Sequence, residues 1–352
     1  MTATASTAVT RGESRMLIAG RLVDAESGRT FPNVNPATEA VLGEVSDASA
    51  PDMDRAIGAA RQAFDETKWA TDGAFRKHCL EQLQAALEAE REELRAELVA
   101  EVGCPVLITY GPQLDAPLED GLVWPAGLID SFGWERDLPV GTAFGMRSWR
   151  RVVKEPVGVV GAIVPWNYPF EVTIHKLGQA LAAGNTVVLK PAPDTPWNAT
   201  RIGRLAAEHT DMPPGVLNVV TSSDHLLGEQ LVTDPRVDLI SFTGSTAVGR
   251  RIMEKGAPTL KRLFLELGGK SADIVLDDAD FAAKLPSAAF VCVHGGQGCA
   301  MLTRLLVPRS RYEEAIEMIA PGFAQVAYGD PTDPSVLQGP QISERQRDRV
   351  LG

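Results

Sequence analysis

The 352-residue sequence lacks the features that mark membrane-spanning, secreted and nucleic-acid-binding proteins. No run approaches the roughly 18 consecutive apolar residues of a membrane-spanning helix, and residues 1–16 contain no apolar segment suited to a signal peptide. The formal net charge of −12 is opposite to the positive excess expected of a nucleic-acid binder. We therefore expect a cytoplasmic protein with no membrane or nucleic-acid partner, whose residues 1–16 form a flexible polar tail.

Cysteine and histidine are scarce, with four and five residues respectively. The histidines are scattered, and no C-x-x-C pair occurs among the cysteines, which are Cys79, Cys104, Cys292 and Cys299. These spacings argue against a zinc site, and we expect no bound metal. Without a secretory signal, free thiols are favoured over disulfides. Cys292, in the apolar stretch AAFVCVHG, is expected to be a packed thiol.

Apolar residues, by contrast, make up 44% of the chain, enough for a large core. Short apolar runs and turn residues over 17–50 predict a small hairpin on the surface of something larger. Residues 51–66 predict a helix because proline and aspartate suit its first turn. Leucines at helical spacing predict another helix over 72–102, ending at Gly103, with the charged run EAEREELRAE as its solvated face; they are Leu80, Leu83, Leu87, Leu94 and Leu98.

From residue 152 onward, short apolar runs alternate with helical segments. The predicted strands are VGVVGAIV, NTVVLKP, VLNVVT, VDLISFTG and LFLELGG. Strands and helices at this spacing are typical of βαβ units, in which a parallel sheet is covered by helices on both faces. The sequence therefore predicts an α/β fold. Ligands of such folds bind at the carboxyl ends of the strands.

Polar groups follow four of these predicted strands. Asn167 comes just after the first, Lys190 ends the second, residues 244–249 (GSTAVG) lead from the fourth into a helix, and Glu266 ends the fifth. A glycine-rich turn at a helix N-terminus suits a phosphate, although this one is not G-x-G-x-x-G. Lys190 could equally be solvated and Asn167 could cap a turn. Glu266, flanked by leucines, needs a partner, water or a function.

Taken together and in this order, five motifs resemble those of the aldehyde dehydrogenase superfamily. They are PWNYPF, VVLKPAPDTP, FTGSTAVG, LELGGKSADIVLDDAD and GGQGCAMLTR. The resemblance runs from about residue 17 to residue 352. It implies a Rossmann-like, parallel-sheet dinucleotide-binding domain formed by residues 17–136 and 155–268.

The same resemblance implies that residues 269–352 form the first part of an α/β catalytic domain. Family members continue well beyond the position of Gly352, with an E-x-F-G-P motif and further strands, so we expect this chain to be truncated at its C-terminus. Residues 137–154 resemble the family hairpin that bridges subunits. The full-length protein is therefore expected to be a homo-oligomer.

For chemistry, the resemblance implies the oxidation of an aldehyde to a carboxylic acid with NAD(P)+. The Cys299 thiolate is implied to attack the aldehyde carbon, giving a thiohemiacetal whose oxyanion is held by the Asn167 side-chain amide and the Cys299 N–H. Hydride transfer would leave a thioester. Glu266 is implied to activate the water that releases the acid. His175 either shapes the substrate entrance or lies on a helix surface.

The implied cofactor is NAD. NADP stays open because Pro193 stands where NAD-preferring members often carry a glutamate. By position in the motifs, the cofactor residues are Ile163, Pro165, Trp166, Asn167, Lys190, Gly228, Phe242, Gly244, Ser245, Val248, Gly249 and Leu267.

Two other classes of function stay open. A non-catalytic nucleotide-binding protein would use the dinucleotide motifs alone, without a complete catalytic domain. A cysteine acyl-transfer enzyme, such as a hydrolase, would use the cysteine, the carboxylate and the amide without hydride chemistry. The dinucleotide motifs favour the redox reaction over the second of these.

Overall fold

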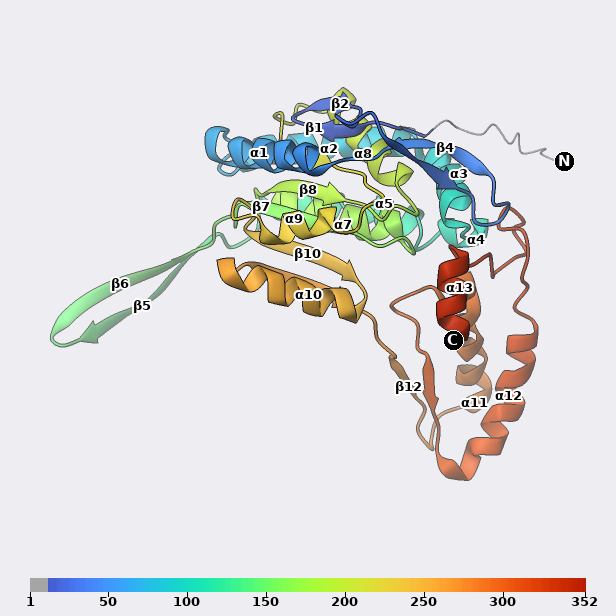
Figure 1. Cartoon of the computed structure of the whole chain (residues 1–352). Coiled ribbons are helices and arrows are strands. Elements are labelled where there is room, and N and C mark those ends of the chain that lie inside the picture. The colour runs from blue at the N-terminus through green and yellow to red at the C-terminus, as the bar shows by residue number, and fades with distance from the viewer. Residues whose placement is uncertain (1–11) are drawn as a thin grey trace.

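The structure, a computed structural model, describes residues 12–352. It is built around a seven-stranded sheet, whose central strands are seen in Figure 1. The strand order is β11-β10-β7-β8-β9-β1-β2. The five predicted strands form its parallel part: β7 (Val159–Ile163), β8 (Thr186–Lys190), β9 (Leu217–Val219), β10 (Leu239–Gly244) and β11 (Arg262–Leu267). The predicted α/β fold is confirmed.

The N-terminal region contributes two hairpins where the sequence predicted one. β1 (Met16–Ile18) and β2 (Arg21–Val23) extend the central sheet, since β1 pairs antiparallel with β9. β3 (Thr30–Val34) and β4 (Val41–Ser46) form a separate two-stranded sheet. Of the predicted tail, residues 1–11 lie outside the described residues, and Met16 already belongs to a buried strand.

Helices cover both faces of the sheet. One face carries α1 (Ala50–Glu66), α9 (Leu227–Thr233) and α10 (Thr246–Gly256). The other carries α7 (Pro169–Ala182) and α8 (Trp197–His209), with α2 (Gly73–Ala89) and α3 (Arg91–Val102) packed against them. Helix α1 begins one residue before the predicted start, because the Ser49 N–H donates to the Asp52 carboxylate over 2.8 Å in a capping box.

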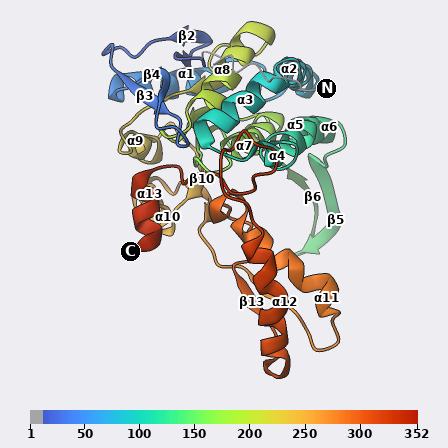
Figure 2. The ribbon, with the colours of Figure 1, turned by 90° about the vertical axis from the view of Figure 1, so that its right-hand side faces the viewer.

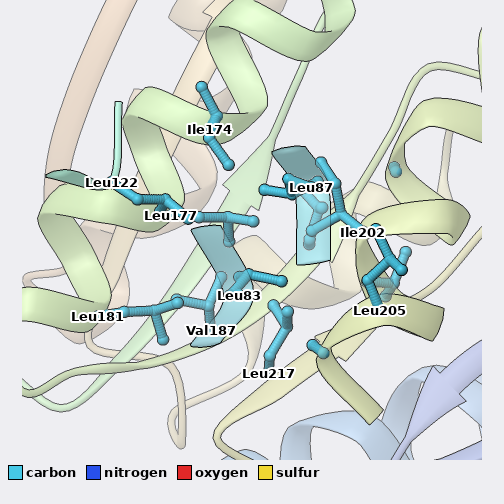
Figure 3. Packing of buried hydrophobic residues seen from close by; sticks show 14 of the residues in the cluster. Leu83, Leu87, Leu122, Ile174, Leu177, Leu181, Val187, Ile202, Leu205 and Leu217 are labelled. Atoms are coloured by element: carbon cyan, nitrogen blue, oxygen red, sulfur yellow. The ribbon is translucent and has the colours of Figure 1, made fainter. Parts of the chain in front are cut away.

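Alternating side chains of the central strands divide the core into two layers. In β8, Val187 and Leu189 belong to the cluster under α2, α7 and α8, whereas Val188 belongs to the cluster under α1 and α9. Figure 3 shows Val187 and Leu217 of the sheet facing leucines of α2 and α7. Burying each such side chain contributes about 1.5–3 kcal/mol, so these layers hold the strand ends in place.

The predicted helix over residues 72–102 is in fact two helices, because the chain turns at Glu90 between α2 and α3. All five leucines are buried, and Gly103 ends α3 in the left-handed conformation, as the sequence predicted. The interpretation of EAEREELRAE as a solvated face holds for Glu92 and Glu93, which are exposed, but is wrong for the rest of the charged face. Arg95 and Glu97 are buried, and Glu97 receives two hydrogen bonds from Arg201 of α8, which packs against this face.

A long hairpin projects from the body of the molecule (Figure 1). It consists of β5 (Glu135–Ala143) and β6 (Met146–Val153), two residues longer at its start than predicted. Three short helices precede it: α4 (Val106–Thr109), α5 (Asp115–Asp120) and α6 (Val123–Leu128).

Residues 269–352 form a smaller lobe beside the carboxyl ends of the strands (Figures 1 and 2). β12 (Ala272–Ile274) and β13 (Arg304–Leu306) pair in parallel, and a small core surrounds Phe281. The helices from residue 257 onward are η1 (Ala257–Thr259), α11 (Phe281–Lys284), η2 (Leu285–Gly296), η3 (Arg309–Arg311), α12 (Tyr312–Ala324) and α13 (Glu344–Leu351). Within residues 12–352, no helix combines the length and apolar character needed to cross a membrane.

Candidate active site

Strand register brings the predicted groups to one edge of the sheet. Ile163 at the end of β7 lies opposite Lys190 on one side and Phe242 on the other. On β11, Glu266 lies opposite Thr243 of β10. From β7, the chain first adds β8 on one side of that strand and later adds β10 on its other side. This edge is therefore the topological switch point, at which such sheets bind ligands.

A pocket of about 820 Å³ opens at this edge, within the size range of small-molecule and cofactor sites. Its walls are the strand ends, the start of α10, the loop 296–299 and part of α13. The predicted residues that line it are Ile163, Pro165, Trp166, Asn167, Lys190, Gly228, Phe242, Gly244, Ser245, Val248, Glu266, Leu267 and Cys299. Gly249 does not line it but supports Leu267 from behind, since an added Cβ would lie 2.6 Å from Leu267 Cδ2.

Lys190 lies in the wall of the pocket with only 4% of its surface exposed, so the solvated alternative is wrong. Burial lowers the pKa of its ammonium group to about 8, and the charges of Asp224 and Asp47 partly oppose this. A buried ammonium is costly unless polar groups satisfy it. Ligand hydroxyl or phosphate oxygens in the pocket would supply such partners.

The N-terminus of α10 forms another wall that suits an anion. Ser245 caps this helix, and its Oγ accepts a hydrogen bond of 3.3 Å from the Val248 N–H. The positive end of the helix dipole therefore faces the pocket. Lys270 and Arg349 add positive charge to the lining. These donors fit the phosphates and ribose hydroxyls of a dinucleotide.

Cys299 is exposed in this pocket, whereas Cys79 and Cys104 are buried and Cys292 is half-buried. Its loop is preceded by left-handed backbone at His294, Gly295 and Gly296, with φ of 57°, 65° and 71°. Partial burial raises the pKa of the Cys299 thiol, and the charges of Glu266 and Glu171 add to this. The backbone N–H groups of Cys299 and Ala300 act in the opposite direction.

Glu266 is exposed, which corrects the premise that its apolar flanks bury it. The reason is the alternation along β11, in which Leu263, Leu265 and Leu267 pack against the core while Glu266 lies on the opposite, exposed face. Lys176, which the sequence reasoning missed, lies close enough to Glu266 for the charge of that carboxylate to oppose the lowering of the lysine pKa by burial. Lys176 Nζ donates to Ser241 Oγ over 2.8 Å, and burial lowers its pKa to about 8. A lone lysine within the apolar helical stretch VTIHKLGQALA was the available signal.

Asn167 connects the end of β7 to the cysteine loop. Its side-chain Nδ2 donates to the backbone oxygen of Gln297 over 2.8 Å, two residues before Cys299. Its backbone oxygen accepts hydrogen bonds from Gln113 and His294, neither of which the sequence reasoning singled out. His175 is not part of this site; its Nε2 lies 3.5 Å from Asp120 Oδ1, outside the pocket.

Comparison with known proteins identifies the family of this chain. The sequence profile of the Aldehyde dehydrogenase family matches residues 22–352. The mitochondrial aldehyde dehydrogenase of Leishmania tarentolae is 38% identical over 347 residues, which cover 98% of this chain and 68% of the relative.

Solved structures give the same result. The γ-glutamyl-γ-aminobutyraldehyde dehydrogenase of Burkholderia cenocepacia has a TM-score of 0.90 at 38% identity, covering 97% of this chain and 68% of that one. An indole-3-acetaldehyde dehydrogenase in complex with NAD+ has a TM-score of 0.89 at 35% identity, with the same coverage. The chain belongs to the aldehyde dehydrogenase family.

Proposed function

We propose that this chain oxidises an aldehyde to a carboxylic acid with NAD+, and that Cys299 is the nucleophile. The observation that carries the proposal is a single pocket in which an exposed cysteine lies together with Glu266, Asn167 and the anion-suited strand ends. Nucleophile, carboxylate, amide donor and cofactor groups are the set that this oxidation requires.

NAD+ is the proposed cofactor because a relative of similar fold was solved with NAD+ bound, and because the groups of this pocket fit it. Lys190 would hold the adenosine ribose, and the turn from Gly244 to the start of α10 would lie beside the pyrophosphate. Pro193, which lines the pocket, brings no carboxylate to repel the extra phosphate of NADP. The proposal therefore includes NADP+ as an alternative substrate of the same site.

In the proposed mechanism, the Cys299 thiol loses its proton to solvent, and the thiolate forms a bond to the aldehyde carbon. The oxygen of the aldehyde becomes an oxyanion, which accepts hydrogen bonds from the Cys299 N–H and from the Asn167 amide. A bound nicotinamide ring would supply the hydride acceptor, and loss of hydride from the thiohemiacetal carbon would re-form the C=O bond as a Cys299 thioester. Glu266 then takes a proton from water as that water attacks the Cys299 thioester, releasing the acid and restoring the thiolate.

The test is aldehyde-dependent reduction of NAD+, followed by absorbance, in the wild type and in Cys299→Ala. The matched control is Cys292→Ala, the same substitution seven positions earlier and outside the pocket lining. We expect turnover to disappear in Cys299→Ala and to survive in Cys292→Ala. Turnover that survives Cys299→Ala would overturn the proposed nucleophile. If the wild type binds NAD+ without turnover, the result would favour a non-catalytic nucleotide-binding protein. If it cleaves esters without NAD+, the result would favour an acyl-transfer enzyme.

We also propose the domain division implied by the sequence, with residues 17–136 and 155–268 binding the dinucleotide and residues 269–352 carrying the nucleophile. The β5–β6 hairpin is proposed to contact another copy of this chain. Its large apolar side chains support this, because Phe144 is 100% exposed and Trp149 is 76% exposed. Exposed apolar side chains gathered on one element commonly mark an interaction site.

A further inference from the structure

Two buried side chains donate to the backbone oxygen of Asn167. Gln113 Nε2 lies 2.8 Å from this oxygen, and His294 Nε2 lies 3.1 Å from it. Gln113 comes from the segment between α4 and α5, and His294 from the cysteine loop, 127 residues after Asn167. The backbone oxygen of Asn167 is therefore held by donors from two segments that are far apart in the sequence.

The chemistry of the carbonyl determines the state of the histidine. A carbonyl oxygen only accepts hydrogen bonds, so His294 Nε2 must carry the proton. Burial lowers the pKa of His294 to about 4, so the ring is neutral near pH 7 and its Nδ1 is bare. Nδ1 of His294 and Oε1 of Gln113 are buried without a hydrogen-bond partner. Each such atom costs stability, which an apolar side chain would avoid.

The surroundings hold the ring and its loop in one place. The His294 ring packs edge-on against Tyr168, with ring centroids 5.6 Å apart and an interplanar angle of 88°. The His294 N–H donates to the Leu337 oxygen over 2.9 Å, and Gln297 Nε2 donates to the His294 oxygen over 2.9 Å. The donor that meets Asn167 is thus part of the same loop that presents Cys299.

We propose that His294 and Gln113 are positioning residues, which hold the Asn167 peptide so that its side-chain amide is directed to the oxyanion formed at Cys299. This inference rests on the proposed function. The Asn167 amide already uses one N–H on Gln297, so its orientation is defined by that bond and by the two donors on its backbone oxygen. The unsatisfied atoms are the cost in stability of that orientation.

The experiment compares His294→Leu with His294→Gln. Both side chains are unbranched at Cβ and meet the same left-handed backbone at φ 57°, so the backbone cost is matched. Glutamine alone places an amide N–H near the position of Nε2. A misplacement on the order of 1 Å costs about a hundredfold in rate, so we expect kcat of His294→Leu to fall roughly tenfold to a hundredfold.

The expected pattern separates positioning from a general loss of structure. In His294→Leu, the KM for NAD+ should stay within about twofold of the wild-type value, because the lost donor meets only the backbone oxygen of Asn167, whereas Lys190 and the start of α10 keep their places in the pocket. His294→Gln should restore most of kcat, and Gln113→Met should lower kcat in the same way as His294→Leu. Equal kcat in the leucine and glutamine variants would overturn the proposal.

A second measurement does not depend on turnover. NMR of the 15N-histidine-labelled full chain reports the tautomer of each ring, and we expect His294 to show the Nε2–H tautomer at pH 7. The Nδ1–H tautomer would overturn the proposal, whatever the activity, because Nε2 could then not donate to Asn167. A wild type that shows this tautomer but no turnover would instead count against the proposed function.

Discussion

Replacing Arg201 with methionine should destabilise the fold strongly. Two bonds join Arg201 of α8 to Glu97 of α3, with Nε and Nη2 lying 3.1 and 2.8 Å from Oε2. The Glu97 side chain is 0% exposed and the Arg201 side chain 7% exposed. Removing the arginine leaves the carboxylate buried without a counter-charge. Breaking a buried pair in this way costs about 3–5 kcal/mol.

The size of the loss should depend on pH in a defined direction. Burial raises the pKa of Glu97, and the charge of Arg201 opposes this rise. Without Arg201, the folded-state pKa of Glu97 rises further. When the pKa of a carboxyl is higher in the folded than in the unfolded protein, its contribution to stability is fully present below the unfolded-state pKa. That contribution is lost as the pH rises through the folded-state pKa. The arginine is therefore needed most at high pH, and the variant should lose more stability at pH 8 than at pH 5.

The assay is urea unfolding followed by tryptophan fluorescence at both pH values. The double variant Glu97→Leu with Arg201→Met should recover much of the lost stability, because neither partner of this buried pair remains to be left uncompensated. Arg204→Met is the matched control, since Arg204 and its partner Glu90 are partly exposed, and it should cost less. A loss below about 1 kcal/mol at pH 8, or an equal loss at both pH values, would refute the reasoning.

Two other predictions concern the pocket and the hairpin. Lys190→Met should weaken NAD+ binding roughly tenfold, because a charge-assisted hydrogen bond is lost. It should not lower the free energy of unfolding, because the substitution also removes a buried ammonium group. Calorimetric titration measures the affinity for NAD+, and an unchanged affinity would contradict the role of Lys190. Trp149→Asp should lower the mass measured by light scattering if the hairpin joins copies of this chain, and a wild type of monomer mass would count against that contact.

The sequence predicted the strands well because of where they lie. A parallel strand covered on both faces is apolar along its whole length, and β7 and β8 are therefore visible as continuous apolar runs. The same reasoning failed for Glu266, since β11 also looks apolar but is an edge strand with one exposed face, on which Glu266 lies. An apolar run does not distinguish an edge strand from a central one.

The charged run in α3 could not be interpreted from local sequence. Glu97 occurs among other charged residues of a helix, where a solvated face is the ordinary outcome. Its burial depends on Arg201, 104 residues away, on a helix that packs against it. The break between α2 and α3 was also hidden, because glutamate at position 90 is a good helix former.

The residues of the site also differ in how far the sequence could predict them. Cys299, Glu266 and Lys190 stand at strand ends or in motifs, so topology and family resemblance located them. Gln113 and His294 act through a single hydrogen bond each to the backbone of a distant residue. Such a contact depends on neither periodicity nor spacing, and so it leaves no pattern in the sequence.

Asn167 connects the proposed cofactor groups to the loop of the proposed nucleophile, so substitutions around it should differ in effect from substitutions at the cofactor groups. It follows β7, beside the cofactor groups, while its side chain donates to the loop of Cys299. Gln297 extends the connection, because its Nε2 donates to the Pro340 oxygen over 3.2 Å and its Oε1 accepts from the Ile342 N–H over 3.1 Å. Lys190 has no part in these bonds, so its replacement should change cofactor affinity alone. Changes around Asn167 should instead alter the rate of the reaction at Cys299, since the same hydrogen bonds hold the amide and the loop.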